Sequence, residues 1–210
     1  MQRKWMASAF VAVFALGLGA GKVFSQDEQG GGGQGGAEQG GPTPEQMQAW
    51  MDYMTPGDAH KRMAAQNGEW TIASKIWMAG PDGPAEETTG QAKFRMMLGN
   101  RYQVQEYTGI AMGMPFQGFG VNAFDNATKE YVGTWFDTFG TGAMVTRGKA
   151  DDKGVITTEG DIVEPSGGTM HVRQVVTPKG DDSFVLEMYM SGGPMPAEAK
   201  WMELTYTRKK

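Results

Sequence analysis

The residues with the widest chemical scope are scarce in this chain, which contains two histidines and no cysteine. A hydrolytic zinc site uses about three protein ligands, usually rich in histidine, so His60 and His171 alone do not favour one. A Ser-His-Asp hydrolase is also disfavoured, because the nucleophile pattern G-x-S-x-G does not occur. Either histidine could act as the single axial ligand of a haem, although we expect His60 in a surface or capping position. His171 lies between Met170 and Val172, and that spacing predicts an outward direction.

Carboxylates and one arginine form the second group of candidates. Glu106 shares its predicted strand face with Tyr102 and Val104, and Asp137 shares one with Tyr131 and Trp135. An apolar face is the buried one, so this pattern predicts that both carboxylates point inward. A buried carboxylate is costly unless it is paired, and Arg173 is a suitable partner for it or for the carboxylate of a ligand. The alternative is a register shift of one residue, which would place all three groups in water. Carboxylate-based acid catalysis is the enzyme class that this composition leaves open.

Methionine pairs are the third candidate, among 17 methionines in the chain. Met112 with Met114 and Met188 with Met190 have the M-x-M spacing of thioether ligands, which suit copper(I). Strand alternation would place both members of each pair on one face, where methionine also serves as adaptable packing or as a pocket lining. We therefore predict packing or lining ahead of copper(I) binding, and no metal site.

A nucleic-acid partner is disfavoured by the charge of the chain. Lys and Arg number 19 against 24 Asp and Glu, a formal net charge of −5, whereas nucleic-acid binding requires clustered positive charge. Gly118 and Gly120 are not followed by a helical pattern, so they do not predict a phosphate-binding loop. They indicate a bend or a close approach of a neighbouring group within a strand.

The N-terminal segment has the features of an export signal. Arg3 and Lys4 precede an apolar run over 5–20, and Val23 and Ser25 have the small-residue spacing of a cleavage site. The run is shorter than the roughly 20 residues of a spanning helix. We predict a signal peptide over 1–25 and no stable membrane span after cleavage. The protein is then exported, to the periplasm or the medium of a bacterium.

A linker and a helical segment follow the signal. Residues 26–43 are rich in Gly and Gln and predict a flexible linker without a packed core. Thr43, Pro44 and Gln46 then have the pattern of a helix start. An apolar stripe at helical spacing comes next: Met47, Trp50, Met51 and Met54. A second short helix reaches Gln66, so 44–67 form an N-terminal helical segment.

The remaining residues, 68–210, have the period of β-strands. Ten alternating runs are separated by short segments rich in turn residues, such as PDGP, LGNR, DNATKE and TPKGDD. Short connections predict an antiparallel meander, and a long meander protects its edges by closing. We therefore predict an all-β, up-and-down barrel of about 8–10 strands preceded by two short helices. A barrel of this size can hold one small ligand, in a lumen lined by residues such as Phe94, Met96, Phe116 and Trp135.

Two resemblances support this prediction. Gly68 and Trp70 at the start of the first strand, with Arg208 near the end of the last, resemble the calycin pattern of lipocalins. The resemblance implies a tryptophan that plugs one barrel end and an arginine that lies across its ring. The stretch MGMPFQGFGVNAFDNATKEYVGTWFDTFGTGAMV (112–145), together with TPGDAHKRM (55–63) and LEMY…MELTYTRK (186–209), resembles the bacterial domain of unknown function 1579. That family implies a lipocalin-like barrel in an exported protein and no assigned activity.

Three functions remain open at this stage. The first is binding of a small apolar or amphipathic ligand in the lumen. The second is a structural or interaction module of the cell envelope, with a filled barrel and the stripe of 47–54 docked on a partner. The third comprises the haem, copper(I) and carboxylate-based alternatives, which the composition disfavours. No residue pattern in the sequence identifies the ligand or the oligomeric state.

Overall fold

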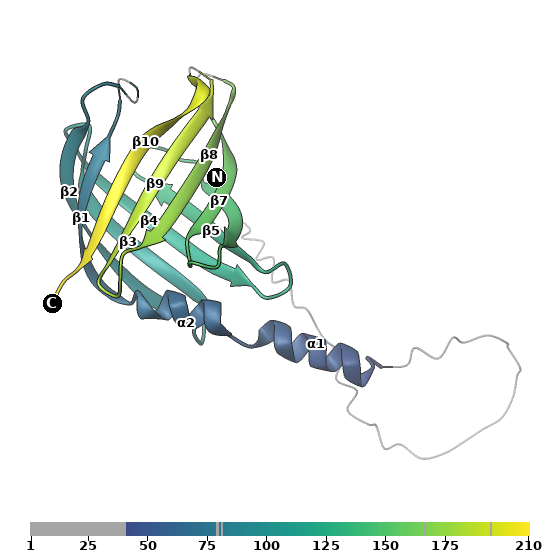
Figure 1. The fold of residues 1–210 in the computed structure, drawn as a ribbon. Coiled ribbons are helices and arrows are strands. Elements are labelled where there is room, and N and C mark those ends of the chain that lie inside the picture. Colours follow the sequence, from purple (N-terminus) through teal and green to yellow (C-terminus); the bar gives the residue numbers. More distant parts are fainter. Residues whose placement is uncertain (1–40, 79, 81, 166, 194) are drawn as a thin grey trace, which may run out of the picture. The chain divides into compact units, whose positions relative to one another are not determined.

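The computed structural model describes residues 41–210, apart from 79, 81, 166 and 194. Ten antiparallel strands close into one barrel, in which each strand pairs with its neighbours in sequence and the first pairs with the last (Figure 1). The strands are β1 (Gly68–Ile76), β2 (Glu86–Met97), β3 (Tyr102–Ala111), β4 (Met114–Asp125), β5 (Glu130–Asp137), β6 (Met144–Ala150), β7 (Ile156–Val163), β8 (Thr169–Pro178), β9 (Ser183–Gly192) and β10 (Met195–Arg208). Helices α1 (Pro44–Met54) and α2 (Asp58–Ala65) precede them.

The all-β, up-and-down barrel predicted from the sequence is confirmed, with ten strands and an N-terminal helical segment, α1 and α2, that bends at 55–57. The predicted signal peptide and most of the predicted linker lie outside the described residues. Within the described part of the chain, neither helix is long or apolar enough to cross a bilayer, since α1 has 11 residues and α2 has 8.

Strand alternation determines which side chains face the interior. In β1 the buried residues are Trp70, Ile72, Ser74 and Ile76, and the residues between them are exposed. Residues that pair directly across two strands share a face, so the pairing register carries this assignment around the barrel. Trp70 lies opposite Ala92, for example, and Ala92 lies opposite Tyr107.

Helix α1 begins with a complete capping box. The Thr43 hydroxyl accepts from the Gln46 N–H at 3.2 Å, and the Gln46 side chain accepts from the Thr43 N–H at 2.8 Å. No residue of α1 is buried, and its apolar stripe at 47–54 is exposed. The Asn126 side-chain amide donates to the carbonyls of Asp52, Tyr53 and Thr55, which attaches the C-terminal end of α1 to the turn between β4 and β5.

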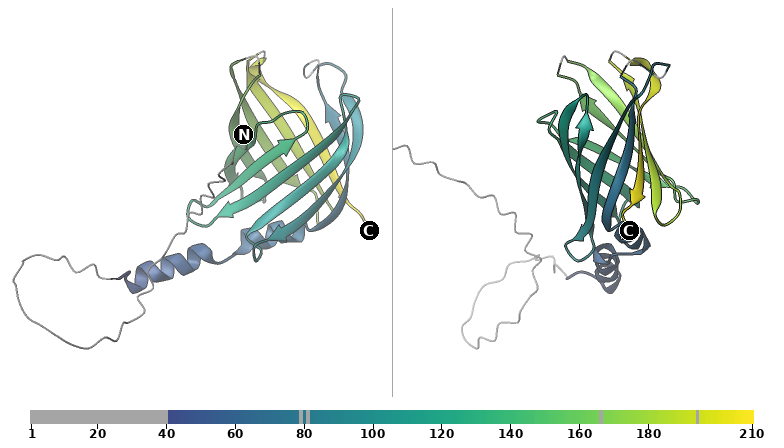
Figure 2. Two further views of the ribbon diagram at one scale, coloured as in Figure 1. Left: turned by 180° about the vertical axis from the view of Figure 1, so that it is seen from behind. Right: turned by 90° about the vertical axis from the view of Figure 1, so that its left-hand side faces the viewer.

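Helix α2 lies across one end of the barrel (Figures 1 and 2). Its buried residues Ala59 and Met63 pack with Tyr131 of β5. The partly buried residues around them are Met96, Phe124, Ala150 and Ile156. Helix α2 contacts β2, β3 and β4 here, and its apolar side chains seal this end. We call it the closed end, and we call the opposite end, where β1 finishes and β10 begins, the open end.

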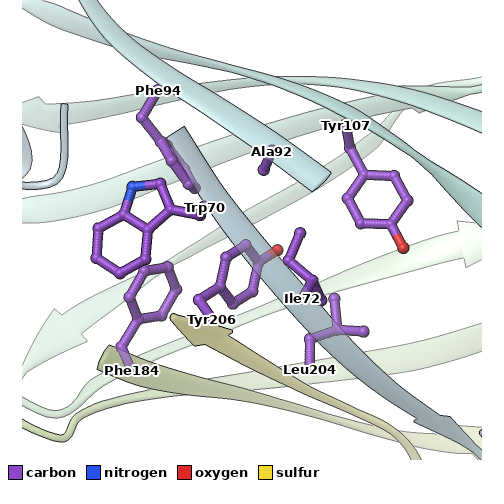
Figure 3. Packing of buried hydrophobic residues seen from close by; sticks show 8 residues of the cluster. All are labelled: Trp70, Ile72, Ala92, Phe94, Tyr107, Phe184, Leu204 and Tyr206. Atoms are coloured by element: carbon purple, nitrogen blue, oxygen red, sulfur yellow. The ribbon is translucent and has the colours of Figure 1, made fainter. Parts of the chain in front are cut away.

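An aromatic cluster fills the barrel just inside the closed end (Figure 3). Phe184 stacks on Tyr206 with ring centroids 4.3 Å apart, and Trp70 meets Phe184 edge-on at 5.1 Å. Phe94 contacts all three rings, with centroid distances from 6.0 to 6.3 Å. Such edge-to-face pairs add to the free energy gained by burying the rings, so this cluster is the main core of the domain.

Candidate ligand-binding lumen

The burial of the interior side chains differs between the aromatic cluster and the open end of the barrel. Toward the open end some inward-facing side chains are only partly buried, among them Phe116, Trp135, Leu186 and Met202, which pack against the cluster. Others at that end are fully buried, including Ile76, Val172 and Met188. We call the interior between the aromatic cluster and the open end the upper lumen; its lining is aromatic, aliphatic and thioether, and the part around Phe116 and Trp135 retains contact with solvent. The four predicted lining residues face inward, but Phe94 and Met96 belong to the packed closed half, and Phe116 and Trp135 belong to the upper lumen.

Glycines on β4 create the space that Trp135 occupies. A Cβ atom on Gly118 would overlap the indole ring of Trp135, and one on Gly120 would lie 3.1 Å from it. Gly118 pairs with Asp137 and Gly120 pairs with Trp135, so the ring lies flat along the inner wall. The sequence predicted a bend or a close approach at Gly118 and Gly120, and the Trp135 ring is the group that approaches them.

Tyr107 and Phe139 extend the aromatic wall on either side of Phe116. The Phe116 ring meets Tyr107 at 5.6 Å and Phe139 at 4.9 Å between centroids, both edge-on. Tyr107 lies 6.4 Å from Trp135. Phe139 is 41% exposed, so the wall reaches from the packed core to the open rim.

Asp137 lies at the open end of β5 and orients the tryptophan. One carboxylate oxygen accepts from the Trp135 indole N–H at 2.9 Å, and the other accepts from the backbone N–H of Phe139 at 2.9 Å. The expected inward direction of Asp137 agrees with the register, in which it pairs with Gly118. Its partners are an indole and a turn amide, where the sequence analysis had suggested an arginine.

Polar side chains inside the closed half are bonded to one another. The Gln103 amide donates to the carbonyl of Met63 in α2 at 2.7 Å and accepts from the Asn122 amide at 3.1 Å. Gln105 donates to the Tyr206 hydroxyl at 3.0 Å. Burial raises the pKa of Tyr206, so this hydroxyl is neutral.

Glu106 is on the outer wall, contrary to the predicted inward direction. Its carboxylate lies 3.5 Å from the Arg95 guanidinium, and both side chains are about half exposed. The sequence grouped Glu106 with Val104, but the register pairs Phe94 with Gln105 and so turns Gln103, Gln105 and Tyr107 inward. Judged from β3 alone, the apolar side chain of Val104 had indicated the wrong face as the inward one.

Arg173 is also on the outer wall, which corrects its prediction as a lumen residue. Its guanidinium makes two hydrogen bonds to Glu198, at 2.8 and 2.6 Å, and lies 4.1 Å from the Tyr189 ring centroid. These hydrogen bonds lower the pKa of Glu198 and raise that of Arg173. Val172 and Gln174, on either side of Arg173 in β8, face the lumen instead.

The two methionine pairs differ in position. Met188 and Met190 share one face of β9, as predicted, and the register turns that face inward. Met112 has a φ of 52° in the turn after β3, so it does not share a strand face with Met114, and that part of the prediction is wrong. Among the described residues no group of three or more His, Cys, Asp or Glu is placed to hold a metal ion.

Neither histidine faces the lumen from a strand. His171 points outward, with Nδ1 2.9 Å from an Asp161 carboxylate oxygen. His60 is only 5% exposed, which corrects the surface alternative, and its Nδ1 accepts from the Gly57 N–H at 3.0 Å, which agrees with the capping alternative. Burial lowers the pKa of His60.

At the closed end, Arg208 lies over the ring of Trp70, with its guanidinium carbon 4.3 Å from the ring centroid. Arg208 also donates to the carbonyls of Ala65 and Asn67, each at 2.7 Å, and Trp70 donates to the carbonyl of Gln66 at 2.9 Å. The expected contact is thus present, and both side chains also bond to the segment that joins α2 to β1.

Comparison with known proteins agrees with this architecture. Residues 55–208 match the sequence model of a family described as a protein of unknown function, DUF1579. No curated protein matches the chain. The S-type phycobiliprotein lyase CPES from Guillardia theta has a similar structure, with a TM-score of 0.52 and 9% identity over 80% of this chain and 99% of the lyase. A redesigned beta barrel matches 70% of this chain and 95% of its own, with a TM-score of 0.38 and 15% identity.

Proposed function

Because the chain belongs to the DUF1579 family of proteins of unknown function, we propose its function from its own geometry: the barrel binds a small apolar or amphipathic molecule in the upper lumen. The observation that carries this proposal is the contrast within the interior. Trp70, Phe94 and the rest of their cluster at the closed end are buried, whereas the aromatic side chains of Phe116 and Trp135 are only partly buried. Apolar surface left open to water inside a closed fold favours an apolar occupant.

The charge of the lumen supports a ligand whose buried part is uncharged. Of the described strand residues between the two rims, none that faces inward is charged, and the inward Glu86 and Asp137 lie at the open rim. Burying a charged group without a partner is costly. We therefore propose that any charged part of the ligand remains at the rim, near Asp137.

A neutral apolar dye, N-phenyl-1-naphthylamine, tests this function. We expect its fluorescence to rise on addition of the full chain and to saturate at one dye per protein. Val176 faces the interior against the aromatic cluster, and Val175 beside it faces outward opposite Glu187, so the two form a matched pair. We expect Val176→Phe to fill part of the lumen and weaken dye binding about tenfold, and Val175→Phe to leave it unchanged.

Two results would contradict the lumen as the binding site. Equal dye affinity in the two variants would place the dye on the outer surface. Absence of saturable binding in the parent chain, with circular dichroism typical of folded β-protein, would favour the filled structural barrel.

We further propose that the protein functions outside the cytoplasm. The basis is the N-terminal pattern of Arg3 and Lys4, an apolar run and Ser25, which lies outside the described residues. Expression of the full chain in an exporting bacterium should yield a product that begins at Gln26, measured by intact mass. A product of full mass confined to the cytoplasm would contradict export.

A further inference from the structure

Two buried hydroxyls in the lumen wall have no hydrogen-bond partner in the described part of the chain. They are the side-chain oxygens of Ser74 on β1 and Thr88 on β2. Ser74 is 3% exposed, and it lies directly opposite Thr88 in the register. Both face inward, because Ser74 alternates with the buried residues Ile72 and Ile76. They differ in this from the polar side chains of the closed half, which are hydrogen-bonded.

Unpartnered buried hydroxyls are uncommon because they give up hydrogen bonds with water and receive none in return. The backbone around them does not require a hydroxyl, since β1 and β2 are joined by a regular antiparallel ladder. Valine has nearly the shape of threonine and would fill the position of Thr88 without a buried polar atom. Packing therefore does not explain the hydroxyl, whereas a group that enters the lumen and accepts hydrogen bonds does.

The position of the pair suits an acceptor on a lumen ligand. Residues directly opposite in an antiparallel pair have Cβ atoms about 5 Å apart, so one oxygen between them can accept from both hydroxyls. One step nearer the closed end, the Tyr107 hydroxyl lies over the inward glycines, 2.7 Å from where a Cβ of Gly109 would be. Hydroxyls thus gather on β1–β3, while β10, which pairs with β1, and β9 beside it contribute Met202 and Met188.

We propose that Ser74 and Thr88 bind the uncharged carbonyl oxygen of an amphipathic ligand, such as a ketone, ester or amide. This inference rests on the proposed lumen function and names the polar group that the lumen recognises. The ligand's apolar part lies against Phe116 and Trp135. Ser74 and Thr88 are closed to solvent, so the carbonyl reaches them by displacing the flexible methionines. Neutral donors match a neutral acceptor, because no inward charge lies at this level of the barrel.

Two fluorescent probes that differ in one group test the inference. The first is 6-propionyl-2-dimethylaminonaphthalene, which carries a ketone, and the second is 2-dimethylaminonaphthalene, which lacks it. We expect the double variant Ser74→Ala, Thr88→Val to bind the ketone probe about tenfold more weakly than the parent, the equivalent of one hydrogen bond. The probe without the ketone should change less than about twofold.

A control variant and a spectral readout separate recognition from packing. Thr89→Val removes the outward hydroxyl next along β2, and it should leave both affinities unchanged. The bound ketone probe should emit at longer wavelength in the parent than in the double variant, because hydrogen bonding to the carbonyl shifts its emission to the red. The double variant should also unfold at the same or a higher temperature than the parent, because it buries two fewer unpaired polar groups.

The results that overturn the inference differ from those that overturn the function. If the double variant binds the ketone probe with unchanged affinity, the two hydroxyls do not bind the carbonyl and instead hydrogen-bond a water molecule. If both probes lose affinity equally, the two side chains contribute only to the shape of the lumen. Either result leaves lumen binding intact. If neither probe binds the parent chain, the lumen function is refuted and the inference with it.

Discussion

The contact between Trp70 and Arg208 predicts a coupled loss of stability at the closed end. Trp70 is 1% exposed, and replacement by leucine removes its ring contacts and leaves the Gln66 carbonyl without its indole donor. We expect Trp70→Leu to cost about 3 kcal/mol of unfolding free energy. Arg208→Ala removes two 2.7 Å hydrogen bonds and the bond to Asp182, and because this side chain is 24% exposed we expect about 2 kcal/mol.

The two losses should not add. Each single variant already removes the stacking of the guanidinium on the indole, which is worth about 1 kcal/mol in a partly buried position. The double variant should therefore lose about 4 kcal/mol, against a sum of about 5. Urea unfolding followed by circular dichroism measures all four proteins without relying on tryptophan fluorescence.

Lys209→Ala supplies the matched control for this cycle. Lys209 is the next residue along the chain and bonds to Gln91 and Glu69, away from the indole. Its loss should add to that of Trp70→Leu within about 0.3 kcal/mol. If Arg208→Ala proves equally additive with Trp70→Leu, the stacking contributes nothing and the account of the closed end is refuted.

Two further predictions concern the lumen wall and the effect of pH. Gly118→Ala should destabilise the fold by about 1–3 kcal/mol by overlap with the indole of Trp135, and Trp135→Ala should abolish most of that cost. Gly142→Ala, where no atom lies within 4 Å, is the control, and equal melting temperatures for the two glycine variants would contradict the overlap. Burial lowers the pKa of His60 below its ordinary value of 6.5, so the unfolded chain binds this proton more readily. The contribution of His60 to stability is thus complete above about pH 6.5 and declines below it. His60→Gln should therefore reduce the fall in melting temperature between about pH 7.5 and about 5.5. An unchanged fall would contradict this.

Much of the fold followed from local patterns in the sequence. Alternation over 68–76 and the short turns between later strands depend on neighbouring residues, so a single chain is enough to predict an antiparallel barrel. The cap at Thr43 and Gln46 is equally local. The resemblance to lipocalins also placed Arg208 over Trp70, although 138 positions separate them.

The candidate site was predictable only in part, because inward direction depends on the partner strand. Trp135 and Phe116 were identified correctly because a large aromatic side chain in a strand favours the buried face, whatever the pairing register. Glu106 was misplaced because β3 carries apolar and polar residues on both faces, and only its register with β2 turns Gln105 inward. Arg173 was misplaced because its partner Glu198 lies 25 residues away on another strand.

The sequence by itself thus determined the class of fold, the strand count and the aromatic residues available to the lumen. The tertiary structure alone decided which of them meet: the glycines under Trp135, the seal made by α2, and the pair of hydroxyls at Ser74 and Thr88. The physical reason is that secondary structure depends on interactions between near neighbours in the chain. A cavity is instead formed by side chains from strands far apart in sequence, whose faces are set by the register with which the barrel closes.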